Sequence, residues 1–476
     1  MNISIQSISQ QSGIQFGTSG LRGLVSQMTY QVCYAYTLAF LDTIAIQPGQ
    51  AVAVGIDLRP SSPDIARACA DAILARGGVL DYCGQLPTPA LAFYAKQHAM
   101  PAVMVTGSHI PFDRNGIKFY RAEGEISKQD EANITSALVE LPDNTPSLPL
   151  PAANPRALLC YQQRYLDLFD ANALSGLKVG VYQHSSVARD LLPEVLQGLG
   201  ATVVCIDRTE HFVPIDTEAV SHEDALKALA WSADYQLDAI VTTDGDADRP
   251  LIADEIGTWL RGDIVGLLTA RFLGAKAVVT PISCNTALEL SGYFAEVIRT
   301  RIGSPYVIAE MEALTPERHP VAGFEANGGF MAGEGLHVHG RMIESLLTRD
   351  AVLPILSLLV MAAQAGGQLS QLSQGLPERY TFSDRLQEIP NAFTRSLLEA
   401  VIQTPEKLVL SDFDLGAIES VSTLDGVRIC YESGAIIHLR GSGNAPELRC
   451  YAESADADRS KQLVAASLAW VRATQA

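Results

Sequence analysis

The sequence predicts an α/β protein with three βαβ-type mixed-sheet domains and a C-terminal α+β domain. Short apolar runs rich in β-branched residues alternate with helical patterns, which is typical of βαβ units and a mainly parallel sheet. The length of 476 residues is enough for three or four domains. Closely spaced strands before one terminal helix indicate a different, α+β architecture at the C-terminus.

The composition fits a folded protein and excludes several functional classes. Hydrophobic residues make up 47% of the chain, and the formal net charge is −19. This charge opposes binding to nucleic acid or to an anionic membrane, so we expect neither as a partner. The eight cysteines occur singly and the N-terminus has no signal-peptide pattern, which favours a cytoplasmic protein. The most apolar stretch, Val352–Ala363, is too short to span a bilayer and is interpreted as a buried core helix.

The elements of the first domain begin with a strand over Ala51–Asp57, followed by a helix over Ser62–Arg76 and a strand over Pro101–Ser108. Five prolines between Leu141 and Arg156 then interrupt any helix or central strand and indicate a linker. A second, weaker linker is expected over Ala365–Arg379. We expect domains over residues 1–153, 154–255, 256–372 and 373–476.

The second and third domains repeat this order of elements. In the second, a helix over Val187–Leu199 precedes a strand over Leu237–Asp246. In the third, a strand over Lys276–Ser283 precedes one within His319–Gly329. In each of the three domains a buried strand therefore ends in a polar, glycine-containing loop. Because open α/β sheets bind ligands at the carboxyl ends of their strands, these loops are where we expect chemistry.

The loop DGDADR is the strongest local signal. Asp244, Asp246 and Asp248 alternate, and we expect their carboxylates to point to one side of an extended loop. Three gathered carboxylates repel one another unless a hard cation such as Mg²⁺ neutralises them. An EF-hand is disfavoured because Arg249 stands where that loop requires glycine and because a strand, not a helix, precedes it. The remaining alternative is a solvated acidic turn.

Ser108 leaves a buried strand in the sequence VMVTGSHIP. A serine hydrolase would need GxSxG, but residues 106 to 110 read TGSHI. By itself this serine could equally be a helix cap or a loop hydroxyl.

Two glycine-rich turns carry arginine and fit an anion. FGTSGLRG presents Arg22, and LRGSGNAPELRCY forms a compact donor array of Arg440, Ser442, Gly443, Asn444 and Arg449. Either could be an ordinary turn. In GFEANGG, Glu325 and Asn327 lie two residues apart and suit sugar hydroxyl groups.

Taken in order, FGTSGLRG, TGSHIP, NGIKFY, DGDADR, GFEANGG and RGSGNAPELR resemble the α-D-phosphohexomutase superfamily, in particular bacterial phosphomannomutase/phosphoglucomutase proteins. The resemblance implies Mg²⁺-dependent interconversion of hexose 1-phosphate and 6-phosphate through a phosphoserine and a hexose 1,6-bisphosphate. It implies mannose phosphate as the substrate, glucose phosphate as a second one, and a monomer or homodimer. The resemblance also implies that the four domains surround a central cleft, and the partner bound there would be a small-molecule sugar phosphate.

The resemblance also implies roles for individual residues. Ser108 would be the phosphorylated serine and, with Asp244, Asp246 and Asp248, a metal ligand. Arg22 and Lys118 would assist proton transfer and bind the reacting phosphate, and His109 and Arg249 would complete the catalytic group. Glu325 and Asn327 would bind the sugar. The distal phosphate would bind to Arg440, Ser442, Gly443, Asn444 and Arg449.

Some positions depart from the usual family motifs. Asn444 and Ala445 replace threonine and glutamate in the phosphate loop, Ile110 replaces asparagine after the serine, and Asn327 and Gly329 replace serine and histidine in the sugar loop. The motif FEAN is similar to the N-acetylglucosamine-phosphate mutase branch, so a hexosamine-phosphate mutase is an alternative. A non-catalytic sugar-phosphate sensor and a metal-dependent phosphatase are two others.

Overall fold

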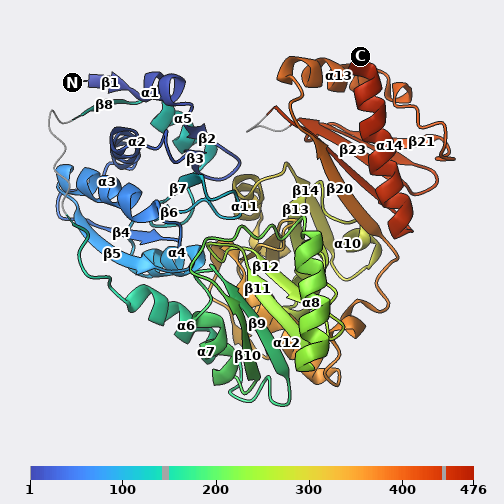
Figure 1. Cartoon of the computed structure of the whole chain (residues 1–476), viewed down its shortest axis with the longest axis horizontal. Coiled ribbons are helices and arrows are strands. Elements are labelled where there is room, and N and C mark those ends of the chain that lie inside the picture. Colours follow the sequence, from blue (N-terminus) through green and yellow to red (C-terminus); the bar gives the residue numbers. More distant parts are fainter. Residues whose placement is uncertain (1, 142–148, 442–445, 476) are drawn as a thin grey trace.

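The computed structural model describes residues 2–141, 149–441 and 446–475. Its elements form four consecutive units, each built around one main sheet, which follow one another in an arc from the N-terminal to the C-terminal unit (Figure 1). Three mixed sheets with helices, followed by an antiparallel sheet, confirm the predicted fold class. No helix in these described ranges is long and apolar enough to span a membrane.

The first unit has a six-stranded sheet in the order β2-β3-β7-β6-β4-β5. Its strands are β2 (Gln15–Phe16), β3 (Leu21–Leu24), β4 (Ala51–Ile56), β5 (Val79–Gln85), β6 (Ala102–Val105) and β7 (Arg114–Tyr120). Its other elements are β1 (Asn2–Ser4), α1 (Ile5–Ser12), α2 (Tyr30–Thr43), α3 (Ser62–Ala75), α4 (Thr88–Gln97), α5 (Lys128–Ser136) and β8 (Leu138–Glu140). Val52 and Val54 face the core formed with α2 and α3, whereas Ala53 faces the core that contains α4. The sheet is therefore covered on both faces.

The second unit has a four-stranded sheet in the order β10-β9-β11-β12. Its elements are α6 (Arg156–Leu168), β9 (Lys178–His184), α7 (Leu191–Gly198), β10 (Thr202–Arg208), α8 (His222–Tyr235), β11 (Ala239–Thr243) and β12 (Pro250–Ala253). Helix α7 begins at Leu191, not at Val187 as predicted. The N–H of Val187 instead donates to the carbonyl of Gly245 at 3.1 Å, so this segment is committed to the loop of the aspartates.

The third unit has a five-stranded sheet in the order β14-β13-β15-β16-β19. Its strands are β13 (Ala277–Pro281), β14 (Glu296–Thr300), β15 (Val321–Phe324), β16 (Phe330–Ala332) and β19 (Leu346–Asp350), with a separate hairpin of β17 (His337–Val338) and β18 (Arg341–Met342). Its helices are α9 (Gly262–Phe272), α10 (Ala287–Leu290), α11 (Ser304–Ala313), η1 (Pro316–Arg318), α12 (Val352–Gln364) and η2 (Leu369–Ser373). Helix α12 is almost entirely buried, which confirms the predicted core helix.

All three sheets share one arrangement that the sequence did not reveal. Each has three parallel strands, and the chain then turns back into an antiparallel strand: β6 is followed by β7, β11 by β12, and β15 by β16. The sheets are therefore mixed, in agreement with the predicted fold class, although the alternation of strands and helices by itself indicated a mainly parallel sheet. Each predicted functional loop is the connection between the last parallel strand and this antiparallel strand. The three loops consequently occupy equivalent positions at the carboxyl ends of buried strands.

A continuous hydrophobic core joins the first three units. It extends from Ala53 in β4 through α6, α7 and α9 to α12, and it ends at Leu369. The C-terminal unit has its own core, formed between residues Leu386 and Val471. The first three units are therefore packed together more intimately than the fourth is packed against them.

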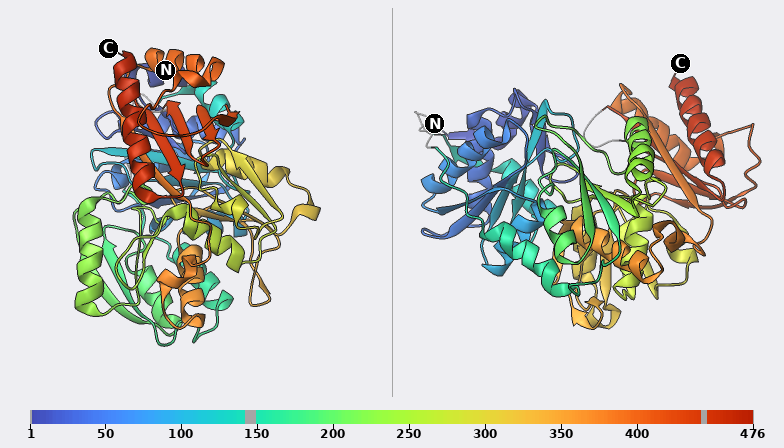
Figure 2. Two further views of the ribbon diagram at one scale, coloured as in Figure 1. Left: turned by 90° about the vertical axis from the view of Figure 1, so that its right-hand side faces the viewer. Right: turned by 60° about the horizontal axis from the view of Figure 1, so that its bottom comes forward.

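The C-terminal unit has an antiparallel sheet in the order β20-β24-β23-β22-β21. Its elements are β20 (Tyr380–Leu386), α13 (Asn391–Gln403), η3 (Pro405–Lys407), β21 (Ile418–Ser422), β22 (Val427–Tyr431), β23 (Ile436–Gly441), β24 (Leu448–Ser454) and α14 (Ala457–Gln475). The long helix α14 packs on β20 and β24 (Figure 2). The predicted strands and terminal helix are confirmed.

Candidate active site

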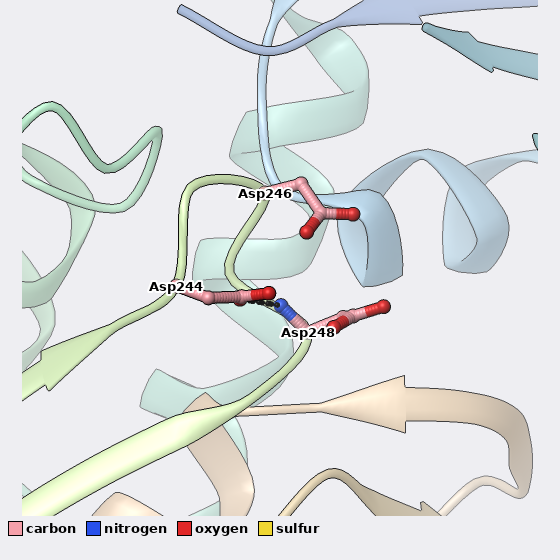
Figure 3. Close-up of side chains that lie close together, drawn as sticks. All are labelled: Asp244, Asp246 and Asp248. Atoms are coloured by element: carbon pink, nitrogen blue, oxygen red, sulfur yellow. Dashed lines mark hydrogen bonds between the residues drawn. The ribbon is translucent and has the colours of Figure 1, made fainter. Parts of the chain in front are cut away.

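The loop between β11 and β12 brings the three aspartates together (Figure 3). One carboxylate oxygen of each of Asp244, Asp246 and Asp248 lies within 4.8 Å of the other two. All three side chains are almost completely buried, which excludes the solvated acidic turn, and strands flank the loop on both sides, which excludes an EF-hand.

The reason for this convergence differs from the predicted one. The loop is a tight turn and not an extended segment, since the N–H of Asp244 donates to the carbonyl of Arg249 at 3.1 Å and Ala247 has a φ of 56°. The carboxylates therefore meet because the backbone folds back on itself, and not because alternate residues share a face.

The hydrogen bonds of the aspartates leave oxygen atoms that suit a cation. Oδ1 of Asp246 and Oδ1 of Asp248 are buried and accept no hydrogen bond from the described residues. A buried carboxylate oxygen that accepts no hydrogen bond is costly, and a hard divalent cation would use such oxygens as the ligands it prefers. The donor set therefore fits Mg²⁺.

The charge around the three carboxylates is distributed unevenly. Burial, reinforced by the charges of Asp246 and Asp248, raises the pKa of the Asp244 carboxyl well above its ordinary value. Burial would also raise the pKa of Asp248, but Arg349, Lys118 and Arg249 outweigh it and hold that pKa below its usual range. Asp248 is thus paired with three of the protein's own cations, one of which, Lys118, it shares with Asp246.

Ser108 lies directly against this loop. Its Oγ donates to Oδ2 of Asp244 at 2.5 Å, across 136 residues of sequence. The side chain is fully buried, and a φ of 53° places the residue in the left-handed region, which is uncommon for a serine. The serine and the metal loop therefore form one site.

Arg59 holds the serine loop in this conformation. Its guanidinium donates to the carbonyls of Pro111 and Arg114 through one terminal nitrogen, and to those of Ser108 and Ile110 through the other, at 2.5 to 2.9 Å. Gly107 makes room for it, because a Cβ there would lie 2.6 Å from Cζ of Arg59.

Asp57 supports the same loop from β4. Its Oδ2 lies 3.2 Å from Nε of Arg59 and accepts from the Thr106 hydroxyl at 2.8 Å and from the Gly107 N–H at 3.2 Å. Both charged side chains are completely buried. The left-handed serine is thus held by one buried ion pair within its own unit.

Two side chains of the first unit bind the metal loop. Lys118, from β7, donates to Oδ2 of Asp246 at 2.7 Å and to Oδ2 of Asp248 at 2.6 Å. Thr88, at the start of α4, donates its hydroxyl to Oδ2 of Asp246 at 2.5 Å, and its N–H to the Asp246 carbonyl at 2.9 Å. These side-chain bonds all go to Oδ2, so within the described part of the chain Oδ1 of Asp246 and of Asp248 is left without a hydrogen bond.

His109, Arg249 and Arg22 also lie at this site. The terminal Nη1 of Arg249 donates to Nδ1 of His109 at 2.7 Å. Because arginine cannot accept, Nδ1 of His109 is unprotonated in this arrangement. Burial, with Arg249 and Arg22 near by, lowers the pKa of His109 well below its ordinary value. Burial and repulsion from Arg249 and Arg349 lower the pKa of Arg22 to about 10.

The loop between β15 and β16, which the sequence predicts to bind the sugar and which we call the sugar loop, contributes buried side chains. Glu325 Oε2 accepts from Arg349 at 2.8 Å. Asn327 folds back on its own loop, where its Oδ1 accepts from the N–H of Gly329 at 2.9 Å. The backbone carbonyl of Asn327 accepts from the Thr217 hydroxyl at 2.8 Å. Glu325 and Asn327 are therefore not equivalent, because only Glu325 joins the charged network around the aspartates.

The C-terminal unit presents a row of arginines. Arg385, Arg449 and Arg440 stand directly opposite one another on β20, β24 and β23. Arg440 pairs with Asp425 at 2.9 Å, and Arg385 and Arg449 share Glu447 at 3.8 and 3.6 Å. Like charges directly opposite in a sheet repel, so this row favours an anion. Ser442, Gly443 and Asn444 lie outside the described residues.

Sequence reasoning missed several residues of these networks, among them Asp57, Arg59, Thr88, Arg349 and Arg385. No spacing links them to the loops that they contact. The sequence LRPSS after a buried strand is a weak signal for Arg59 only, because a charged pair that follows a strand of apolar residues stands at the carboxyl end of a sheet.

Comparisons with known proteins agree with this geometry. Residues 13–143, 161–257 and 261–380 match phosphoglucomutase/phosphomannomutase alpha/beta/alpha domains I, II and III, and residues 397–469 match the C-terminal domain of the same family. The chain is similar to a phosphomannomutase of Salmonella muenchen, with 48% identity over 93% of this chain and 92% of that protein.

Two further comparisons indicate the same family. A phosphomannomutase of Sinorhizobium fredii is 45% identical over 96% of this chain and 98% of its own length. The crystal structure of a phosphoglucomutase/phosphomannomutase family protein of Burkholderia thailandensis has a TM-score of 0.74 at 20% identity and covers 99% of this chain and 98% of that one. With all four domains matched in order, the chain belongs to the phosphoglucomutase/phosphomannomutase family.

Proposed function

We propose that this protein is a phosphomannomutase that interconverts mannose 1-phosphate and mannose 6-phosphate, with glucose phosphates as a second substrate pair. The observation that carries this proposal is the 2.5 Å contact between the Ser108 hydroxyl and Asp244, within a buried cluster of three aspartates. The two phosphomannomutase relatives described above support the choice of mannose over other hexoses.

In the proposed reaction, Ser108 carries a phosphoryl group and donates it to the free hydroxyl of a hexose 1-phosphate. As the P–O bond to the sugar forms, the P–O bond to Ser108 breaks, and the proton of the sugar hydroxyl ends on the Ser108 oxygen. The sugar product is a hexose 1,6-bisphosphate. The bisphosphate turns end for end, and Ser108 takes the phosphoryl group from C1. The product is the 6-phosphate, and the phosphoserine is restored.

The surrounding residues have separate roles in this proposal. Asp244, Asp246 and Asp248 would hold Mg²⁺, which supplies positive charge to the transferring phosphoryl group. Arg249 and Arg22 add positive charge beside the same group, and neutral His109 accepts from Arg249 and so orients it. Lys118 donates to Oδ2 of both Asp246 and Asp248, which fixes the two carboxylates relative to each other and leaves Oδ1 of each without a hydrogen bond from the residues that the structure describes.

The C-terminal arginines would bind the phosphate that does not react. Arg440 and Arg449, with Ser442, Gly443 and Asn444, are the residues we assign to this role, and the row formed with Arg385 supports it. Two separate anion sites are what a reaction with a bisphosphorylated intermediate requires, because one phosphate must be held while the other reacts.

The test is a coupled assay with the 1-phosphates of mannose, glucose, glucosamine and N-acetylglucosamine, each with a trace of the corresponding bisphosphate. We expect the highest kcat/KM with mannose 1-phosphate. A preference for a hexosamine phosphate would favour the hexosamine-phosphate mutase, free phosphate as the main product would favour a phosphatase, and no turnover would favour the sensor.

The Ser108→Ala variant tests the mechanism. Mass analysis of the wild-type protein treated with bisphosphate should find one phosphoryl group on Ser108, and the variant should carry none and lose turnover. Full activity of Ser108→Ala would contradict the proposed phosphoserine.

A further inference from the structure

Arg349 connects the metal loop to the sugar loop. It lies in β19 and is only 3% exposed. Its Nε and Nη2 donate to Oδ2 of Asp248 at 3.1 and 2.8 Å, and its Nη1 donates to Oε2 of Glu325 at 2.8 Å. One planar guanidinium therefore sets the separation of two carboxylates that belong to different units.

The same guanidinium reaches the N-terminal unit. Nη1 of Arg349 also donates to the Ser304 hydroxyl at 2.8 Å, and this hydroxyl donates to Glu125 at 3.2 Å. Glu125 in turn accepts from Ser19 at 2.6 Å, in the loop that presents Arg22. Arg349 is thus the centre of a network that connects three of the functional loops.

The backbone around Arg349 is itself tightly held. The next residue, Asp350, accepts from the hydroxyl of Tyr161 at 2.8 Å and from that of Tyr165. Asp350 also accepts from the N–H of Val352 at 2.8 Å, at the start of α12. This anchoring leaves the strand end little freedom, so the guanidinium has a defined position.

Gly329 provides the space that Arg349 occupies. A Cβ on residue 329 would lie 2.5 Å from Cδ, 2.8 Å from Cγ and 3.0 Å from Cβ of Arg349. Gly329 is not among the residues with positive φ, so its backbone accepts other residues and only the contact excludes them. Any side chain here would displace the arginine from its two carboxylates.

We propose that Arg349 is a positioning residue of the reaction, and that Gly329 is required to admit it. Arg349 holds Glu325 at a fixed distance from Asp248, so that a sugar bound to Glu325 is aligned with the phosphoryl group at the metal loop. This inference rests on the proposed function. It assigns Arg349 no contact with the substrate, because its donors are engaged by protein groups.

The test uses Arg349→Lys, which keeps the charge but loses the fork, and Gly329→Ala, which deletes no atom but takes the space of the arginine. We expect each to lower kcat about 100-fold, the typical cost of a misplacement near 1 Å. We expect phosphorylation of Ser108 by the bisphosphate to be slowed by a similar factor in both, because this half-reaction needs the same sugar alignment, yet to reach completion, because the serine loop is untouched. The double variant should be no slower than the slower single variant, since both changes remove one interaction.

Arg341→Lys is the matched control. Arg341 lies in the same unit but is half exposed and pairs with Asp170 at 2.7 Å. The kcat of the Arg341→Lys variant should therefore equal that of the wild type. Far-UV circular dichroism checks folding, and Gly329→Ala carries the test if Arg349→Lys unfolds. Wild-type kcat in Gly329→Ala, or losses that multiply in the double variant, would overturn the inference. An inactive wild type would instead overturn the proposed function, and this inference with it.

Discussion

The serine loop and the metal loop face each other across the site, yet they are held in opposite ways. The serine loop has its main supports, Asp57 and Arg59, within its own unit, and most of the bonds go to backbone carbonyls. The metal loop takes its supports from two other units, through Lys118, Thr88 and Arg349, and those bonds go to carboxylates.

The position of the nucleophile and the charge balance of the aspartates therefore depend on different parts of the structure. The position of the nucleophile depends on local backbone geometry, which one unit can provide alone. The charge balance of the aspartates depends on how the first three units pack against one another, and these units share a continuous hydrophobic core. The C-terminal unit has its own core and supplies no partner to either loop among the hydrogen bonds of the described residues.

The largest effect is expected from Arg59→Met, which breaks the local support. It leaves Asp57 buried without its cation and frees four carbonyls, so we expect a loss of about 3–5 kcal/mol in the free energy of unfolding. We expect kcat to fall on the order of 1000-fold as the left-handed serine relaxes. Urea denaturation and the mutase assay measure both.

The control for Arg59→Met is Arg76→Met, which removes an exposed ion pair with Asp42 in the same unit. Its cost should stay below about 1 kcal/mol. If Arg59→Met were as mild as this control, the serine loop would not depend on its local support.

A smaller effect is expected from Lys118→Met, which weakens the support between units. Asp246 and Asp248 lose a shared cation, so kcat should fall about 100-fold. Because bound Mg²⁺ then replaces more of the missing charge, the rise in Tm on adding Mg²⁺ should exceed that of the wild type. Differential scanning calorimetry with and without Mg²⁺ measures this rise.

Lys227→Met, which removes an exposed pair with Glu223, serves as the control for Lys118→Met. It should show the wild-type response to Mg²⁺. An unchanged response in Lys118→Met as well would mean that Lys118 and the cation do not share the same carboxylates.

The smallest effect is expected from Thr88→Val, which removes one neutral donor to Asp246 and keeps the shape of the side chain. A single buried hydrogen bond to a charged group is worth about 1.5–3 kcal/mol, and part of this should appear as a roughly 10-fold fall in kcat. Thr88→Ser keeps the hydroxyl and should restore activity. A Thr88→Ser variant as slow as Thr88→Val would show that packing, and not the hydrogen bond, is what matters.

Much of the fold followed from local patterns in the sequence. The alternation of apolar runs and helices predicted the α/β units, and the buried strands ending in TGSHIP, DGDADR and GFEANGG predicted where the functional loops lie. The tight turn at the aspartates and the antiparallel strand that follows each parallel core were not predicted. A two-residue alternation looks the same in an extended loop and in a turn, and the return strands β12 and β16 are as apolar as the parallel ones.

The sequence by itself determined which chemical groups the protein has and at which strand ends they stand, because strand periodicity and glycine-rich turns are local properties. Only the tertiary structure decided which cation neutralises which carboxylate. Thr88 meets Asp246 across 158 residues and Arg349 meets Asp248 across 101 residues. Contacts over such separations depend on how whole units pack against one another. This packing produces no regular spacing of residues in the sequence, so the two partners cannot be recognised from the sequence.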